Sequence, residues 1–359
     1  MIVVDGSYGE GGGQVLRTSL ALSAVTGQPV RIERIRANRR KPGLQPQHLT
    51  GVRAAARVCN AQVEGARLDV QEMTFTPGSP PQAGSYTFDV ADAARGGSAG
   101  STSLVLHTVL VPLALAAGTS ELTLRGGTHV AWSPPFDYLK RVYLPTLARA
   151  GIEAKVNLRK WGWFPVGGGE VKVTIQGRGA GGSVGDRPQQ GLVGIDLWER
   201  GELLRVRGIS ATSNLPKHIR TRQEGAALGG LRAAGINARV DEMDADSKGQ
   251  GTAVFLWAES ENALAGFTAL GKRGKPAEEV AADAVTELLA YLESGAAVDC
   301  HLADQLVLPL ALAATPSRWT TERVTNHLLT SVWVVNLFFP GRVRVEGEEG
   351  APGACYVEV

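Results

Sequence analysis

Apolar side chains recur along this chain with two spacings, one typical of helices and one typical of strands. Residues 15–25 carry apolar positions at helical spacing, and residues 30–35 alternate apolar and polar side chains as a half-buried strand does. A second helical stretch and a second strand-like stretch follow at 47–59 and 61–64. This part of the chain therefore predicts a unit of helix, strand, helix and strand.

The same unit returns twice later in the chain. The second copy occupies residues 104–116, 121–125, 136–150 and 152–156, and the third occupies 302–313, 319–324, 326–339 and 343–346. Because the copies share an order of elements rather than identical letters, we interpret them as three diverged repeats in an α/β (α+β) fold.

A long stretch separates the second copy from the third. It has strand-like segments at 191–197 and 252–257 and a helical segment at 219–234, which predict a smaller inserted α/β domain. A glycine-rich segment at 177–190 is typical of a linker, and residues 275–292 predict a further helix. The expected division is repeats one and two at 1–184, the inserted domain at 185–275 and the third repeat at 276–359.

Glycine is unusually frequent, with 45 among 359 residues. Most of the glycines stand next to apolar segments, where tight turns need positive φ or a close approach of the backbone. The clusters lie at 9–13, 96–100, 126–127, 167–169 and 179–185.

Composition excludes several classes of protein. With 43% hydrophobic and 20% charged residues, the chain can bury a core and is not a disordered protein. A net charge of +2 provides no general basic field, so any site for a polyanion must be local. The apolar segment 104–117 is interrupted by His107, Thr108 and Pro112, and the first residues lack a signal-peptide pattern. We therefore expect a cytoplasmic protein with no membrane partner.

Three segments are more polar than a core requires. The first, residues 5–17, places Glu10 in a glycine turn and Arg17 about two helical turns later. Backbone N–H groups at a helix start bind phosphate, and a carboxylate beside them can hold a metal. The segment therefore suits a metal-bound polyphosphate, and a glycine-rich hairpin with solvated ends is the alternative.

The second and third segments also have two interpretations. Residues 36–41 hold four cations directly before a helix start, which indicates either a phosphate clamp or a solvated run of charge. These cations are Arg36, Arg39, Arg40 and Lys41. The third segment comprises 301–309 and 325–330. A histidine beside leucines at a helix start is usually a core or capping residue, and a nucleophile is the alternative.

In their order along the chain, these segments resemble the RNA 3′-terminal phosphate cyclases. The shared pieces are Gly-Glu-Gly-Gly-Gly-Gln-x-Leu-Arg at 9–17, the basic segment ending in Gln-His at 36–48, Gly-Ser-Ala-Gly-Ser at 97–101, Ala-Asp-Gln-Leu-x-x-Pro at 303–309 and His-Leu-Leu-Thr at 327–330. The resemblance runs from about Val3 to about Val345. It implies three repeated units, each a four-stranded sheet backed by two helices, with a smaller α/β insert.

The resemblance also implies a reaction. ATP is the co-substrate, His327 attacks its α-phosphorus, and the AMP passes from histidine to the 3′-phosphate of an RNA. The neighbouring 2′-hydroxyl then displaces AMP and closes a 2′,3′-cyclic phosphate. Such a histidine must be neutral to attack, and the in-line transfers need cations and a metal, Mg²⁺ or Mn²⁺. The implied partners are ATP and an RNA ending in a 3′-phosphate, and the resemblance admits a homodimer.

Roles for individual residues follow from the same resemblance. The catalytic group comprises His327, Glu10, Arg17, Arg36 and Arg39, and Glu10 is also the metal ligand. The group expected to bind ATP comprises His107, Pro134, His301, Asp304 and Gln305. The group expected to bind the RNA phosphate comprises Arg40, Lys41, Gln47 and His48.

Two of these positions depart from the bacterial pattern of the family. His107 stands where a glutamine is usual and His301 where a tyrosine is usual. Because imidazole can stack and hydrogen-bond, adenine binding is expected to persist, and the departures bear on selectivity for ATP rather than on the reaction.

Alternative functions remain open at this point. A non-catalytic, cyclase-like ribosome or RNA assembly factor would share the fold, but it would have lost the nucleophile that His327 supplies here. An enolpyruvyl-transferase-like enzyme would need neither the His-Leu-Leu-Thr segment nor a small insert. Within the insert, a group of basic residues indicates either a surface for RNA or a solvated helix end; it comprises Arg205, Arg207, Lys217, His218, Arg220 and Arg222.

Overall fold

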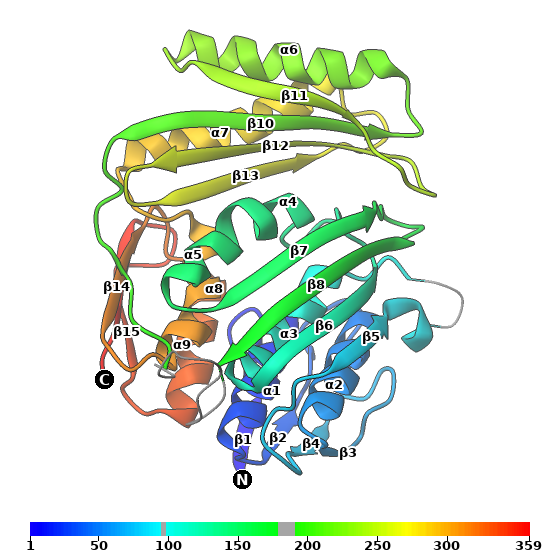
Figure 1. Ribbon diagram of the computed structural model, residues 1–359, viewed down its shortest axis with the longest axis vertical. Helices are drawn as coiled ribbons and strands as arrows, with labels where there is room; N and C mark the ends of the chain where they lie inside the picture. The colour runs from blue at the N-terminus through cyan, green and yellow to red at the C-terminus, as the bar shows by residue number, and fades with distance from the viewer. Residues whose placement is uncertain (95–97, 179–190) are drawn as a thin grey trace.

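The computed structural model describes residues 1–94, 98–178 and 191–359. Its elements form four four-stranded sheets with helices packed against them, which confirms the expected mixed α/β class (Figure 1). Glycines 96 and 97, glycines 179–185 and most of the expected linker lie outside the described residues, while Gly177 and Arg178 are the last residues of a strand.

Three of the four sheets share one topology. The first repeat comprises β1 (Ile2–Asp5), α1 (Gly13–Thr26), β2 (Val30–Glu33), α2 (Pro46–Val58), β3 (Gln62–Glu64) and β4 (Met73–Thr76). Its strand order is β1-β2-β4-β3, with β1 and β2 parallel and the other pairs antiparallel. Each repeat is therefore a βαβαββ unit, two strands longer than the pattern of apolar residues alone predicts.

The second repeat follows the same plan. It comprises β5 (Ser85–Asp89), η1 (Val90–Ala93), α3 (Thr102–Leu115), β6 (Ala117–Gly126), α4 (Phe136–Tyr138), η2 (Leu139–Tyr143), α5 (Leu144–Arg149), β7 (Glu153–Lys160) and β8 (Gly169–Arg178). Its order is β5-β6-β8-β7, again with the first pair parallel. The π-helical turn η2 directly precedes α5, in which Pro145 has no N–H for the regular helical hydrogen bond.

The third repeat is divided by the inserted domain. It comprises β9 (Asp196–Leu197), α8 (Cys300–Ala311), β14 (Ser317–Thr321), α9 (Asn326–Phe338), β15 (Val343–Glu346) and β16 (Gly353–Val357). Its order is β9-β14-β16-β15, and β9 pairs with β14 in parallel. The insert therefore lies between the first strand and the first helix of this repeat.

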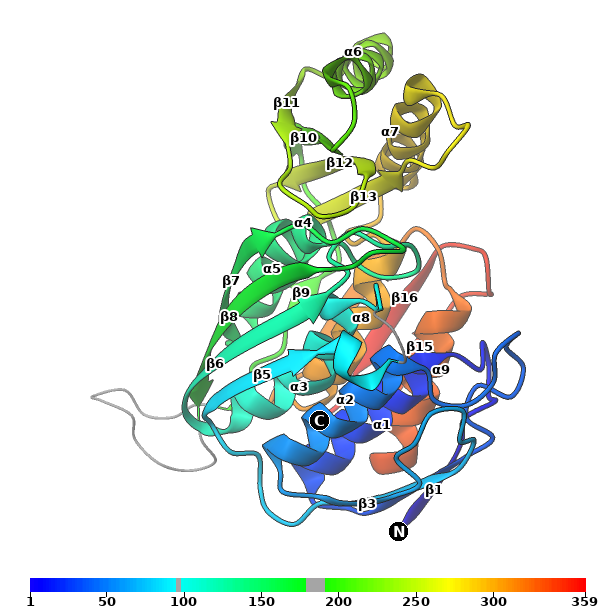
Figure 2. The same cartoon turned by 90° about the vertical axis from the view of Figure 1, so that its right-hand side faces the viewer.

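The insert has its own sheet and core. It comprises β10 (Leu203–Ser213), α6 (Lys217–Ala233), β11 (Ala238–Asp244), β12 (Gly251–Ser260), β13 (Leu264–Leu270) and α7 (Ala277–Ser294). The order is β11-β10-β12-β13, and both helices pack on this sheet, at one end of the molecule (Figures 1 and 2).

With the expected boundaries at 185 and 275, β9 would belong to the insert and α7 to the third repeat, and the structure shows the reverse for both elements. β9 belongs to the sheet of the third repeat, because it pairs with β14. α7 buries Val280, Ala284 and Leu288 in the core of the insert, so the helix expected to open the third repeat packs with the inserted domain instead.

The helices of the three repeats meet in the middle of the main body. α1 packs against α2, α3 and α9, and the sheets cover this group of helices from outside. α3 is apolar on nearly all sides and is accordingly buried all round. This arrangement brings α1 and α9, which are about 300 residues apart in the chain, into direct contact.

None of the described helices is both long enough and apolar enough to cross a lipid bilayer.

Candidate active site

Several of the predicted site residues lie at or near the N-terminal ends of helices in repeats one and three. Glu10 precedes α1, Gln47 and His48 occupy the first turn of α2, and His327 occupies the first turn of α9. Free N–H groups and the positive end of the helix dipole face outward at such ends. These ends therefore suit the binding of phosphate groups.

His327 is positioned by the start of its helix. Thr325 caps α9, its side-chain oxygen accepting a hydrogen bond from the Leu328 N–H at 3.1 Å. The His327 Nε2 atom lies 2.7 Å from Glu10 Oε2, and Nδ1 contacts Gln14 Oε1. Both nitrogens of a half-exposed imidazole in repeat three therefore meet side chains of repeat one.

Gln14 connects three helices at this point. Its side-chain amide donates a 2.7 Å hydrogen bond to Asp304 Oδ2 in α8 and also contacts Ser331 Oγ in α9. Sequence reasoning gave Gln14 no role, although a glutamine at the start of an apolar helix is itself a signal of buried polar contacts.

Glu10 is ionised in this arrangement. The contact with His327 and the Arg39 guanidinium, which lies 2.5 Å from Glu10 Oε1, lower the pKa of Glu10 to about 2. Burial opposes charge on His327, but Glu10 and Asp304 outweigh it and raise the pKa of the imidazole above its ordinary value. The resting site therefore favours an imidazolium next to a carboxylate.

Arg17 lies in the same cluster beneath these groups. Burial lowers its pKa to about 10, against the attraction of Asp304 and Glu10. It forms no ion pair with any other residue that the structure describes, so its charge faces the site without a close counter-ion.

His48 contributes a neutral ring to the cluster. Burial together with Arg36, Arg17 and Arg39 lowers the pKa of His48 to about 3. Its Nδ1 accepts a hydrogen bond from the Gln45 N–H at 3.2 Å. Gly13 adjoins the ring so closely that a Cβ there would lie 2.4 Å from His48 Nε2, which explains the need for glycine at this start of α1.

The other residues of the basic segment have different surroundings. Arg36 donates hydrogen bonds to the carbonyls of Lys41 and Gly43, at 2.6 and 3.0 Å, and so shapes the loop before α2. Arg40 and Lys41 are exposed. Gln47 accepts a 3.0 Å hydrogen bond from the Ser101 N–H, which joins the start of α2 to the start of α3.

Two residues expected to bind ATP have a buried polar atom with no partner. His107 Nε2 and Gln305 Oε1 are both buried without a hydrogen bond to any residue in the described part of the chain. The His107 ring lies 4.8 Å from that of Tyr143, and burial, together with Arg17, lowers the pKa of His107 to about 3. Buried polar atoms are almost always satisfied, so these two atoms are candidates for hydrogen bonds to a ligand.

The remaining residues expected to bind ATP, Asp304, Pro134 and His301, have no direct contact with His327 among the described contacts. Burial raises the pKa of Asp304, which is connected to His327 through Gln14. The carbonyl of Pro134 accepts a 2.7 Å hydrogen bond from Ser103 Oγ, near the start of α3. His301 is exposed in the first turn of α8, and Gln305 Nε2 donates to its carbonyl at 2.7 Å. No described contact joins Pro134 or His301 to His327 itself.

Of the six basic residues noted in the insert, three form ion pairs with carboxylates in the described part of the chain. Arg222 lies 2.7 Å from Glu278, Arg220 lies 3.4 Å from Glu242, and Arg205 contacts Glu259. These ion pairs favour a solvated, salt-bridged surface over a surface for RNA.

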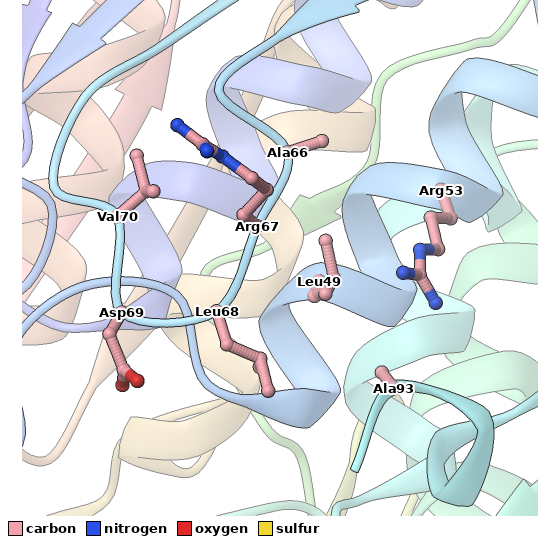
Figure 3. Close-up of a pocket in the computed structure, with 8 residues that line it drawn as sticks. All are labelled: Leu49, Arg53, Ala66, Arg67, Leu68, Asp69, Val70 and Ala93. Carbon is pink, nitrogen blue, oxygen red and sulfur yellow. The ribbon is translucent and has the colours of Figure 1, made fainter. Parts of the chain in front are cut away.

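A surface groove of about 640 Å³ lies beside α2, outside the predicted site (Figure 3). Its lining comprises Leu49, Arg53, Ala66, Arg67, Leu68, Asp69, Val70 and Ala93. None of the predicted site residues is among them, although Leu49 directly follows His48 in the helix.

Comparison with known proteins gives a consistent result. The family model described as RNA 3′-terminal phosphate cyclase matches residues 8–345. A protein of Nostoc punctiforme named RNA 3′-terminal phosphate cyclase is 51% identical over 345 residues, covering 96% of each chain. Proteins of the same name from Methylococcus capsulatus and Pyrococcus furiosus are 50% and 42% identical, over 98% and 99% of this chain and 95% and 98% of their own.

Proposed function

Because the chain belongs to the RNA 3′-terminal phosphate cyclase family, we propose that it closes RNA 3′-phosphates through a covalent adenylate on His327. At the level of the family, the chain is an ATP-dependent ligase that acts on RNA. One observation supports the nucleophile above others. The imidazole of His327 lies between Glu10 and Gln14, within a cluster of arginines and helix starts suited to a polyphosphate.

In the first step, His327 Nε2 forms a bond to the α-phosphorus of ATP. The bond from that phosphorus to the bridging oxygen of pyrophosphate breaks, and pyrophosphate leaves. The imidazolium must first lose its Nε2 proton to solvent, because Glu10 Oε2, 2.7 Å away, belongs to a carboxylate with a pKa of about 2 and orients the ring without keeping the proton. Gln14 keeps the other nitrogen protonated, because its Oε1 accepts from Nδ1–H while its amide group is held by Asp304.

The cations have an electrostatic role in this step. Arg17, Arg39 and the helix starts stabilise charge on the phosphates, while the neutral His48 adds a hydrogen-bonding group without further charge. We assign Arg36, Arg40, Lys41 and Gln47 to the same phosphate-binding surface.

The nucleoside of ATP would occupy the region of α3 and α8. His107 Nε2 and Gln305 Oε1 lack partners among the described residues, so a bound nucleotide would satisfy them. We assign Pro134, His301 and Asp304 to the same pocket.

Glu10 fits a divalent metal, Mg²⁺ or Mn²⁺, held jointly with the phosphates of ATP. Magnesium in such sites is bound by one or two carboxylates together with substrate phosphates, and Glu10 is ionised. Nowhere in residues 1–94, 98–178 and 191–359 do three metal-binding side chains meet, so the protein alone would not provide a closed metal cage. The metal would neutralise phosphate charge.

In the second half of the reaction, AMP passes to the RNA. An oxygen of the RNA 3′-phosphate attacks the α-phosphorus on His327, the P–N bond breaks, and the imidazole takes up a proton from solvent. The 2′-hydroxyl next attacks the activated RNA phosphorus, gives its proton to solvent and releases AMP as leaving group. The product is a 2′,3′-cyclic phosphate.

Labelling with ATP that carries a radioactive α-phosphate tests this proposal. The wild-type protein should acquire an acid-labile, base-stable label in the presence of magnesium, and His327→Ala should acquire none. His218→Ala, at an exposed histidine of α6, is the matched control and should label normally. Persistent label in His327→Ala would overturn the assignment of the nucleophile.

A second assay separates the enzyme from the assembly-factor alternative. RNA ending in a labelled 3′-phosphate should become resistant to phosphatase when incubated with protein and ATP. Failure of the wild-type protein in both assays would favour a non-catalytic role.

A further inference from the structure

The side chain of Trp132 is 98% exposed, although tryptophan is among the most hydrophobic residues. Its backbone has a φ of +63°, which is rare and costly for a bulky residue. Phe164 is also 77% exposed, and it lies in the turn between β7 and β8. Large exposed aromatic groups that lie on neighbouring loops indicate a binding surface.

The two loops are joined to each other. Thr128 and His129 both donate backbone hydrogen bonds to the Gly162 carbonyl, at 2.9 and 3.2 Å. The Gly162 N–H in turn donates to Thr128 Oγ1 at 2.9 Å. The loop that carries Trp132 and the turn that carries Phe164 therefore form one connected structure.

A layer of packed aromatic side chains belongs to the same two loops. The His129 ring stacks on Trp161 with centroids 3.8 Å apart, and His129 Nε2 lies 3.1 Å from Asp137 Oδ2. Trp163 is anchored to the insert by a 2.7 Å hydrogen bond from its Nε1 to Ser213 Oγ. The backbones of the two loops that carry the exposed rings are thus anchored, which lowers the entropy cost of binding a ligand there.

This layer adjoins the proposed site. Pro134, two residues after Trp132, is bonded through its carbonyl to Ser103 in the first turn of α3. Ser101, the cap of that helix, is bonded to Gln47 of the phosphate-binding surface. The exposed rings therefore belong to loops that reach the phosphate-binding surface through two hydrogen bonds and the first turn of α3.

We propose that Trp132 and Phe164 form a stacking surface for the bases immediately upstream of the RNA 3′-phosphate. This inference rests on the proposed function, because it assumes an RNA end at the arginine cluster. Proteins that hold single-stranded RNA typically stack its unpaired bases on aromatic side chains, with little dependence on sequence. A general basic groove is not needed for this mode, in agreement with the net charge of only +2.

The stacking surface explains how the protein holds an RNA end without a large cationic surface. The arginine cluster binds the terminal phosphate, and the aromatic rings bind the bases that every RNA end carries. The tolerated φ strain at Trp132 is then a cost of presenting the ring to the RNA rather than burying it.

The test compares Trp132→Ala, Phe164→Ala and Trp132→Phe with the wild-type protein. The measured quantities are KM for an oligonucleotide with a 3′-phosphate, KM for ATP, and the initial rate of adenylylation without RNA. Loss of one stacking ring should raise KM for the oligonucleotide about 5- to 150-fold, and Trp132→Phe should restore most of the affinity. KM for ATP and the rate of adenylylation should be unchanged.

A matched control and a second substrate sharpen the test. Leu204 is 65% exposed at the start of β10, whereas Ser213 at the other end of that strand contacts Trp163. Leu204→Ala should leave all three quantities unchanged. Ribose 3-phosphate, which carries the sugar and the phosphate but no base, should inhibit the wild type and Trp132→Ala equally.

Two results would overturn the proposal. An unchanged KM for the oligonucleotide in both alanine variants would exclude base stacking, and a raised KM for ATP in Trp132→Ala would assign the ring to the nucleotide instead. Failure of the proposed function is distinguishable, because it would abolish labelling of the wild-type protein before any RNA is added.

Discussion

Two histidines near the candidate active site are held neutral by their surroundings. His48 and His107 are both buried, and neighbouring arginines add to the effect of burial, so the pKa of each is lowered to about 3. A neutral ring can accept a hydrogen bond as well as donate one, which an imidazolium cannot do. The site therefore combines permanent cations with neutral hydrogen-bonding groups.

This burial predicts sensitivity to acid. The unfolded chain protonates a histidine near pH 6.5, whereas folded His107 does so near pH 3, so the unfolded state binds more protons between these values. The free energy of unfolding should therefore fall as pH drops below 6.5, by about 1.4 kcal/mol per pH unit for each such histidine. Between pH 6.5 and pH 5, the free energy of unfolding measured with urea should fall by about 2 kcal/mol less in His107→Phe than in the wild type.

His218→Phe provides the comparison for this measurement. His218 is exposed on α6, so its replacement should leave the pH dependence as it is in the wild type. Equal slopes for the wild type and His107→Phe would mean that His107 is charged or accessible in the folded protein.

At the residue scale, the sequence predicts which residue types form the candidate site better than it predicts their tertiary contacts. Residue types and the family resemblance point to Glu10, Arg17, Arg39 and His327, and the structure brings these residues into one cluster. Gln14 was missed because its contacts are with residues roughly 290 and 317 positions away. No local pattern contains such partners, and only the packing of α1 against α9 brings them close.

At the element scale, the start of α9 determines where the proposed nucleophile lies. Thr325 caps the helix, so that His327 falls in its first turn and faces Glu10. The neighbouring loop is held against the same helix, because Tyr8 stacks on Trp333 with ring centroids 3.9 Å apart. Helix start and loop therefore align the site together.

Removal of this cap should weaken both stability and activity. Thr325→Ala leaves the Leu328 N–H without its partner, and we expect the free energy of unfolding to fall by about 0.5–2 kcal/mol. The rate of adenylylation should also fall, because the first turn that carries His327 would fray. Urea unfolding and single-turnover labelling measure the two effects.

Thr325→Ser retains the hydroxyl oxygen and is the control. It should keep nearly full stability and labelling. If the alanine variant labels at the wild-type rate, the first turn of α9 does not depend on its cap.

The pattern of apolar residues predicted the longer helices well and the sheets only in part. All six helical stretches assigned to the repeats are helical in the structure, and the one at 136–150 is divided by a π-helical turn. β9 has two residues and carries no periodicity of its own, so its membership of the third sheet is visible only from its pairing with β14. Strand order depends on partners distant in sequence, and local alternation does not encode it.

At the scale of the whole molecule, a buried carboxylate joins the insert to two repeats. Asp299 precedes α8, accepts a 2.7 Å hydrogen bond from the Tyr138 hydroxyl of repeat two and accepts a 3.2 Å bond from the Gly266 N–H of the insert. Burial raises the pKa of Asp299 in spite of these donors. The junction therefore depends on donors from separate parts of the fold.

Loss of one donor should destabilise the whole protein. In Tyr138→Phe, Asp299 loses the hydroxyl, and we expect the free energy of unfolding to fall by about 1.5–3 kcal/mol, as for hydrogen bonds to charged groups. Urea unfolding monitored by circular dichroism and by tryptophan fluorescence would measure the loss and show whether the insert separates first.

Tyr86→Phe is the matched control in the same repeat. The Tyr86 hydroxyl donates to the Gln82 carbonyl at 2.7 Å at the surface, where water can replace it. Tyr86→Phe should therefore lower the free energy of unfolding clearly less than Tyr138→Phe does. Equal decreases in the two variants would argue against a special role for the Asp299 junction.

The amino-acid sequence by itself determined the class of fold, the three repeats, the presence of an insert and the residue types of the site. These features are local, because periodicity, glycine turns and short motifs depend on neighbouring residues. The tertiary structure decided which sheet holds β9, which core holds α7 and how His327 meets Glu10 and Gln14. Those features depend on contacts between residues far apart in the chain, which form only when the helices of the three repeats pack together.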